Sequence, residues 1–245
     1  MKVTVVENYN EMSKAVADII YRAVSENPSA TLGLATGSTP LGCYRLLAEF
    51  CAAKKLSFAR VKTVNLDEYV GLDPSDSNSY AYFMRHNLFD AIDVELSNTH
   101  IPDGAVEDVN GECERYSQLL TRIPRDVQIL GLGANGHIGF NEPYTPFDSR
   151  THEVTLAAST VRDNARHFNS IDDVPTRAIT MGIAEIMQAK KIILLANGEA
   201  KAQAVRDAVK GEISEACPAS ILQRHPDCTV IVDKSAAKLI RPNAR

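Results

Sequence analysis

The chain has 245 residues, with 26 Lys and Arg against 31 Asp and Glu, so its formal net charge is -5 with histidine neutral. Hydrophobic residues make up 44% of the sequence, enough for the core of one large α/β domain, and we expect a single domain over residues 1–245. The acidic balance and the lack of a basic run argue against a nucleic-acid partner, which would need clustered Lys and Arg. No apolar stretch approaches the ~20 residues of a membrane span and no signal-peptide pattern is present, so we expect no membrane partner and a cytoplasmic protein.

The cysteines are widely spaced along the chain, and none forms a C-x-x-C pair. This spacing predicts neither a structural zinc site nor a redox pair, and a chain of this size does not need a disulfide scaffold. We therefore expect reduced thiols and no bound metal.

Short apolar runs alternate with amphipathic helical segments along the whole chain. We expect strands over residues 2–7, 31–35, 61–66, 127–132, 154–157, 178–183, 191–196 and 229–232. We expect helices over residues 9–27, 40–54, 80–92, 107–123, 199–210 and 218–223. Strands separated by helices of this length imply crossover connections, and hence a three-layer α/β/α sandwich in which helices cover both faces of a mostly parallel, Rossmann-like sheet. Ligand sites in such sheets lie at the carboxyl ends of the strands.

The turn Thr36-Gly37-Ser38-Thr39 joins the expected strand over 31–35 to the expected helix over 40–54. Gly37 permits a left-handed backbone, Thr39 suits the N-cap and Pro40 suits the first helical turn. Unpaired N–H groups and hydroxyls at a positive helix end suit a phosphate. An ordinary capped turn needs the same residues and remains the alternative. The spacing of a Walker A loop is absent.

Asp67 and Glu68 follow the expected strand over 61–66. Adjacent carboxylates at a strand end cannot both point the same way, so we expect one to face a site and the other to pack sideways. A carboxylate in a partly desolvated cleft has a raised pKa and can act as a base. A role as a helix or turn cap is the alternative for Asp67.

A glycine-rich segment, GLGANGHIGFNEP, continues the expected strand over 127–132. It matches the dinucleotide fingerprint G-x-G-x-x-G, but that fingerprint must open a helix, and Pro143 and Pro146 interrupt the stretch. We reject a nucleotide site and expect no cofactor. The loop still places His137 and Glu142 five residues apart, and a histidine with a carboxylate neighbour can relay protons near neutral pH. A loop histidine without function is the alternative.

Lys201 falls in the first turn of the helix expected over 199–210, just after a turn at Gly198. Cations are disfavoured at a helix N-terminus, and a bound anion would offset that cost. Arg166, in the polar stretch over 160–169, is a second candidate phosphate partner. Solvated surface positions are the alternative for both side chains.

Together these segments resemble the glucosamine-6-phosphate deaminase family, also called glucosamine-6-phosphate isomerase. The similar stretches occur in family order and span nearly the whole chain: LGLATGSTPLGCYRLL, VNLDEYVGL, LGLGANGHIGFNEP and the Gly-x-x-Lys-Ala turn at Lys201. The resemblance implies that glucosamine 6-phosphate and water become fructose 6-phosphate and ammonium, without a cofactor. The implied partner is therefore a small sugar phosphate.

The resemblance also implies roles for individual residues. His137 would open the pyranose ring, Glu142 would tune its charge, and Asp67 would carry a proton from C2 to C1 through an enolamine. Asn135 stands where many members have Asp, so it would orient His137 by hydrogen bonding but could not act as a carboxylate. The phosphate would bind the turn of Thr36, Gly37, Ser38 and Thr39 together with Arg166 and Lys201.

Other functions remain open at this point. The 6-phosphogluconolactonase family has a similar fold, but it typically has Asp-Glu-Arg where this chain has Asp67-Glu68-Tyr69, and it lacks a glutamate at the position of Glu142. A preference for galactosamine 6-phosphate is a closer alternative. A sugar-phosphate-sensing module is the alternative from another class, although a sensor would not need the combination of Asp67, His137 and Glu142.

Some deaminases are allosteric hexamers with a second phosphate site at subunit contacts, and their basic residues follow a Ser-Arg-Thr. In this chain the SRT at residues 149–151 is followed by HEV. We therefore expect a non-allosteric enzyme that is a monomer or a low-order homo-oligomer.

Overall fold

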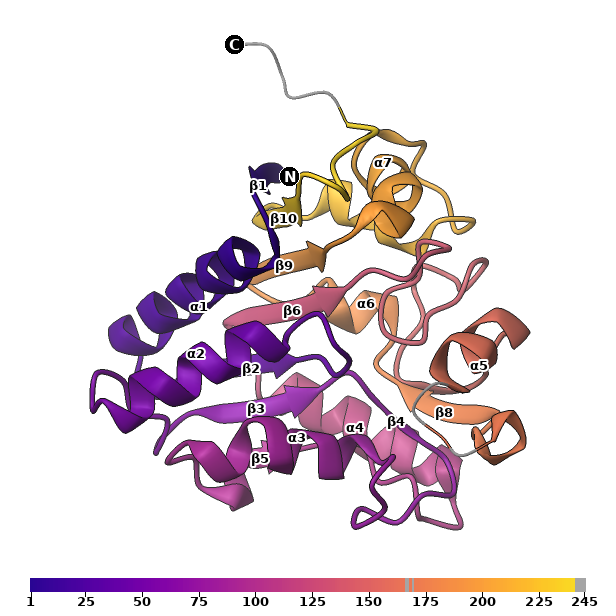
Figure 1. The fold of residues 1–245 in the computed structure, drawn as a ribbon. Helices are drawn as coiled ribbons and strands as arrows, with labels where there is room; N and C mark the ends of the chain where they lie inside the picture. Colours follow the sequence, from indigo (N-terminus) through magenta and orange to yellow (C-terminus); the bar gives the residue numbers. More distant parts are fainter. Residues whose placement is uncertain (166–167, 169, 241–245) are drawn as a thin grey trace.

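The structure, a computed structural model, describes residues 1–165, 168 and 170–240 (Figure 1). Its main sheet consists of β1 (Lys2–Val6), β2 (Thr31–Leu34), β3 (Lys62–Asn65), β5 (Thr99–His100), β6 (Val127–Gly131), β9 (Lys191–Ala196) and β10 (Cys228–Asp233). These seven strands run in the order β1-β10-β9-β6-β2-β3-β5, and every pair is parallel. The expected mostly parallel sheet is confirmed, and β5 is a strand that the sequence did not predict.

Helices surround this sheet, as expected for a three-layer fold. They are α1 (Tyr9–Glu26), α2 (Leu41–Ala52), α3 (Tyr80–Asn87), α4 (Val109–Arg122), α5 (Ala158–Asn164), α6 (Ile183–Ile186) and α7 (Ala202–Lys210). Shorter 3-10 turns are η1 (Phe89–Ala91), η2 (Leu96–Asn98), η4 (Ile171–Asp173), η5 (Glu199–Lys201) and η6 (Pro218–Arg224). Figure 1 shows α1 and α2 side by side in front of the sheet, with α4 and α6 behind it.

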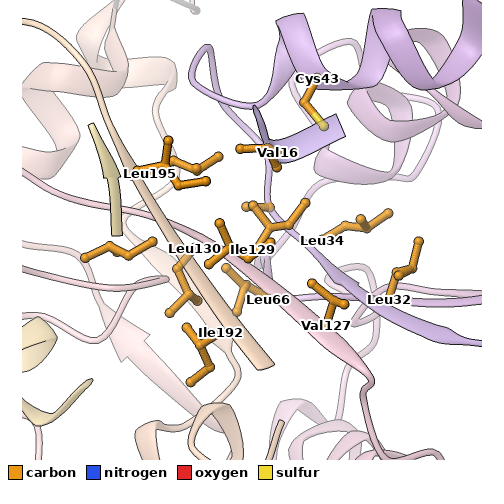
Figure 2. Packing of buried hydrophobic residues seen from close by; sticks show 14 of the residues in the cluster. Val16, Leu32, Leu34, Cys43, Leu66, Val127, Ile129, Leu130, Ile192 and Leu195 are labelled. Atoms are coloured by element: carbon orange, nitrogen blue, oxygen red, sulfur yellow. The ribbon is translucent and has the colours of Figure 1, made fainter. Parts of the chain in front are cut away.

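The core lies between the sheet and its helices. In β9, five consecutive residues after Lys191 are buried, which explains why this strand reads as an uninterrupted apolar run. Figure 2 shows side chains of the central strands, among them Ile129 and Leu195, together with Val16 of α1 and Cys43 of α2. All cysteines are free thiols, as expected. No helix among the described residues is long and apolar enough to span a membrane.

A second, antiparallel sheet corrects the expected topology. It joins β4 (Asp67–Tyr69), β8 (Arg177–Thr180) and β7 (His152–Thr155) in the order β4-β8-β7. The strands expected over 154–157 and 178–183 are these β7 and β8, with shifted bounds. The helix expected over 80–92 ends at Asn87 and continues only as the turn η1, and the segment expected as a helix over 218–223 is the 3-10 turn η6.

Candidate active site

The carboxyl ends of β2, β3, β6 and β9 meet around a cavity of about 200 Å³. Each of the polar strand ends singled out in the sequence contributes to its wall. The lining includes Thr36, Gly37, Thr39, Asp67, Gly133, His137 and Lys201, with Tyr80, Phe140 and Thr160 beside them. The structure therefore brings together segments that lie up to about 165 residues apart in the sequence.

The turn after β2 lies along one side of the cavity. Gly37 has φ +87°, a left-handed conformation that L side chains rarely adopt. Thr39 is not the N-cap of α2, which corrects our expectation: Pro40 occupies that position, and the Gly42 N–H of the first helical turn donates to the Tyr9 hydroxyl at 2.8 Å. Ser38 is exposed, and its carbonyl accepts a hydrogen bond from the Tyr9 hydroxyl at 3.0 Å, so it lies outside the cavity wall.

The two adjacent carboxylates of β4 point in different directions, as expected. Glu68 is 2% exposed, and its carboxylate caps the N-terminus of α3. Its Oε1 accepts from the backbone N–H groups of Tyr69 and Tyr80, both at 2.9 Å. Its Oε2 accepts from the Ser79 hydroxyl at 2.8 Å and the Ala81 N–H at 2.9 Å. Glu68 is therefore the cap and Asp67 is the carboxylate at the cavity.

Asp67 is 6% exposed, and no described residue donates a hydrogen bond to its side chain. Burial, and then the nearby charge of Glu68, raise the pKa of Asp67 to about 8. Strand β4 holds this residue rigidly, because Asp67 pairs with Thr180 of β8 and the Leu66 carbonyl accepts from the Met181 N–H at 2.7 Å. The result is a fixed carboxyl group with a proton affinity suited to acid–base work near neutral pH.

The glycines of the loop after β6 make room for His137. A Cβ on Gly133 would lie 2.4 Å from the imidazole ring atoms, so only glycine allows the ring its place against the backbone. Gly139 has φ +58°, and a Cβ there would lie 3.5 Å from Asp67 Oδ2. The buried Asn141 ties the loop to the end of β8 by donating to the carbonyl of Met181 at 2.8 Å.

Glu142 lies behind His137 and completes the polar cluster. Its Oε2 is 3.5 Å from His137 Nδ1 and accepts from Asn135 Nδ2 at 2.7 Å. The Asn135 Oδ1 in turn accepts from the His137 backbone N–H at 3.2 Å. Burial alone would raise the pKa of Glu142, but the nearby His137 imidazole and the hydrogen bonds from Thr160 and Asn135 lower it to about 2. The carboxylate is therefore ionised beside the imidazole.

Lys201 lies at the junction of η5 and α7 and lines the same cavity. The turn before it is shaped by Gly198, which has φ +87°. Both oxygens of the Asp233 carboxylate accept from the Gly198 N–H at 3.1 Å, which fixes this turn at the end of β10. Arg166, the other expected phosphate partner, lies outside the described residues.

Two residues of the cavity wall carried no signal in the sequence. Tyr80 opens α3, stacks on Phe140 at 6.0 Å between ring centroids and donates its hydroxyl to the Tyr69 hydroxyl at 3.4 Å. Thr160 of α5 donates a hydrogen bond to Glu142. Both come from helices remote in sequence from the residues they contact, so no local spacing could have identified them. The described residues contain no cluster of His, Cys, Asp and Glu able to hold a metal ion.

Known proteins match this chain over nearly its full length. The sequence profile of the family described as glucosamine-6-phosphate isomerases/6-phosphogluconolactonase matches residues 5–231. A glucosamine-6-phosphate deaminase of Lactobacillus delbrueckii subsp. bulgaricus is 52% identical, over 98% of this chain and 100% of the relative. One of Thermoanaerobacter pseudethanolicus is 49% identical, over 98% of this chain and 95% of the relative.

Solved structures agree with these sequence matches. A structure described as a monomeric glucosamine-6-phosphate deaminase superposes with a TM-score of 0.96 at 50% identity, covering 98% of this chain and 100% of that one. The 6-phosphogluconolactonase of Leishmania guyanensis superposes with a TM-score of 0.77 at 19% identity, covering 98% of this chain and 99% of that one. The second likeness concerns the fold alone.

Proposed function

We propose how this chain, which belongs to the family of glucosamine-6-phosphate isomerases and 6-phosphogluconolactonases, catalyses the glucosamine-6-phosphate deaminase reaction. The reaction converts glucosamine 6-phosphate and water to fructose 6-phosphate and ammonium, a step of amino-sugar catabolism. One observation carries the assignment of roles. Asp67 and His137 line the same cavity as Thr36, Gly37, Thr39 and Lys201.

Ring opening is the first step, and we assign it to His137. The C1 hydroxyl loses a proton, the ring oxygen gains one, the C1–O5 bond breaks and C1 becomes an aldehyde. An imidazole can move both protons near neutral pH. The ionised Glu142, 3.5 Å from the ring nitrogen, orients the imidazole. Asn135 supports this arrangement through its hydrogen bonds to Glu142 and to the His137 backbone.

Isomerisation follows, and we assign it to Asp67. The carboxylate removes the C2 proton, the ammonium nitrogen of the substrate loses one proton and the aldehyde oxygen gains one, which gives an enolamine with a C1–C2 double bond. Asp67 then returns its proton to C1, which leaves an iminium at C2. Water adds to the iminium carbon, the C–N bond breaks, the nitrogen leaves as ammonium, and the ketose remains. A protonated carboxyl cannot accept the C2 proton, so the raised pKa of Asp67 makes the active fraction of the unliganded enzyme increase with pH up to about 8. The substrate's cationic amino group beside Asp67 favours the ionised form.

The phosphate is assigned to the turn Thr36–Thr39, the N-terminus of α2 and the ammonium group of Lys201. The helix dipole of α2 favours an anion at this position, and Lys201 adds a positive charge in the same cavity. Ser38 can contribute its backbone N–H although its side chain is exposed. Anchoring the phosphate away from C1 and C2 orients the sugar over Asp67 and His137.

Ammonium release from glucosamine 6-phosphate by the purified protein tests this proposal. Galactosamine 6-phosphate and 6-phosphogluconolactone serve as the competing substrates. Hydrolysis of the lactone without ammonium release would refute the deaminase assignment, and faster turnover of the galactosamine ester would change the substrate. The lactonase alternative is not favoured, because the solved lactonases share only the fold at 18–21% identity.

We place the enzyme in the cytoplasm, as a monomer or low-order homo-oligomer without allosteric activation. The absence of a basic run after Ser149-Arg150-Thr151 supports this, as does the 50% identity to a deaminase described as monomeric. Velocity curves that turn from sigmoidal to hyperbolic with N-acetylglucosamine 6-phosphate would contradict it.

A further inference from the structure

The two oxygens of the Glu142 carboxylate have different partners. Oε2 faces the catalytic loop, where it contacts His137 Nδ1 at 3.5 Å and accepts from Asn135 Nδ2 at 2.7 Å. Oε1 accepts a hydrogen bond from the hydroxyl of Thr160, and no other described side chain donates to it. Thr160 therefore holds one oxygen of the carboxylate, while Asn135 holds the other.

Thr160 comes from a separate element. It lies on α5, is 5% exposed and forms part of the cavity wall, whereas Asn135, His137 and Glu142 all belong to the loop after β6. The donor to the second oxygen therefore comes from outside the loop, and it limits the rotation of the carboxylate plane.

We propose that Thr160 is a positioning residue for the ring-opening step: its hydroxyl orients the Glu142 carboxylate so that the other oxygen stays against the His137 imidazole. This inference rests on the proposed function, because ring opening is the step that uses His137. Without the hydroxyl, Oε1 is a partly buried charged oxygen with no side-chain donor among the described residues. The carboxylate then turns toward water or takes up a proton, and the imidazole loses its oriented partner.

The hydrogen bond from Thr160 is also one of the causes that lower the pKa of Glu142. Its loss therefore raises that pKa from about 2, whichever reaction the enzyme catalyses. Among the described residues, His137 is the titratable group in contact with this carboxylate. It lowers the pKa of Glu142 in wild type and variant alike, so it does not account for a difference between them.

Two substitutions separate the hydroxyl from the shape of the side chain. Thr160→Val keeps the volume and removes the donor, while Thr160→Ser keeps the donor and removes a methyl group. Thr155→Val, on the exposed end of β7, is the matched control for a threonine-to-valine change without a cavity contact. With glucosamine 6-phosphate, Thr160→Val should lower kcat about 10- to 100-fold, the range for one lost hydrogen bond to a charged group, with KM changed less than about three-fold. Thr160→Ser should retain at least about a third of the wild-type kcat.

Titration of the Glu142 side-chain carboxyl by ¹³C NMR provides the second readout, which does not depend on activity. The pKa of Glu142 should rise in Thr160→Val and stay at the wild-type value in Thr160→Ser and Thr155→Val. An unchanged Glu142 titration in Thr160→Val, or equal kinetic losses in the valine and serine variants, overturns the role of Thr160. A wild-type protein that releases no ammonium, but whose Glu142 titration responds to Thr160→Val, refutes the proposed function and upholds the positioning contact.

Discussion

Replacing Asp67 by asparagine should inactivate the enzyme and stabilise its fold at the same time. The pKa of Asp67 is about 8 in the folded protein against 3.8 for an ordinary aspartate. Between these values the unfolded chain has released the proton and the folded chain retains it. Stability therefore falls as pH rises from about 4 to about 8, and levels off above that. The side-chain amide of the Asp67→Asn variant carries no charge in either state, so the variant lacks this loss.

The magnitude follows from the size of the shift. A difference of about four pKa units corresponds to at most about 6 kcal/mol at about 1.4 kcal/mol per unit. Water in the 200 Å³ cavity solvates the carboxylate and reduces that cost. We expect Asp67→Asn to raise the free energy of unfolding by about 1–3 kcal/mol at pH 8 and by less than about 0.5 kcal/mol at pH 4. Turnover should fall at least about 1,000-fold because the Asp67 base is lost, and KM should change little because the phosphate-binding residues remain.

Glu68→Gln is the matched control, one residue away and of the same chemistry. The Glu68 carboxylate accepts four hydrogen bonds at the start of α3, and a glutamine would place an NH2 group against two of these donors. This variant should lose about 2–4 kcal/mol of stability. Urea unfolding at pH 4, 6 and 8, together with ammonium release, measures both variants. If Asp67→Asn destabilises the protein at pH 8, or keeps the wild-type slope of stability with pH, the account of Asp67 as a buried carboxyl of raised pKa is wrong.

The remaining predictions concern the anchor and the loop. Lys201→Met should raise KM for glucosamine 6-phosphate about 10- to 100-fold and leave kcat within about three-fold. Lys55→Met, at an exposed position just after α2, should change neither constant. Steady-state kinetics at two ionic strengths measure both variants, and a loss confined to kcat in Lys201→Met contradicts an anchoring role. Gly133→Ala should lower kcat about 100-fold because its Cβ displaces the His137 ring, while Gly131→Ala, whose Cβ meets nothing within 4 Å, should cost far less. Equal losses in the two alanine variants would show that the loop backbone, rather than the ring position, is sensitive.

The main sheet could be predicted because each of its longer strands carries its own local signal. The apolar run of β9 and the helical spacing of α1 are examples. Strand β4 has three residues, and its partner β8 lies about 110 residues further along the chain. A pairing of this kind leaves no local periodicity, so the antiparallel sheet was missed. The two-residue β5 was missed for the same reason.

The site, like the fold, contains residues that the sequence could identify and residues that it could not. Asp67, His137 and Lys201 could be located because each follows a recognisable strand and such strands end at one edge of the sheet. The division of roles between Asp67 and Glu68 could be expected only as an alternative, since it depends on where α3 begins in space. Thr160 was placed only in a polar stretch and not at the site, because its contact with Glu142 joins α5 to a loop 18 residues earlier in the chain.

That small sheet also holds one segment of the chain between two fixed ends. Strands β7 and β8 pair in antiparallel fashion up to Thr155 and Arg177, and the Leu156 N–H donates to the Thr176 carbonyl at 2.8 Å. The chain therefore leaves and re-enters the sheet at neighbouring positions, and α5 lies between them. The segment also contacts the site, because Thr160 donates to Glu142 and Phe168 packs edge-on against Tyr69 of β4. A graft that exchanges this segment in search of new sugar-phosphate specificities must therefore keep both contacts, or it disturbs the carboxylate beside His137 and the strand that carries Asp67.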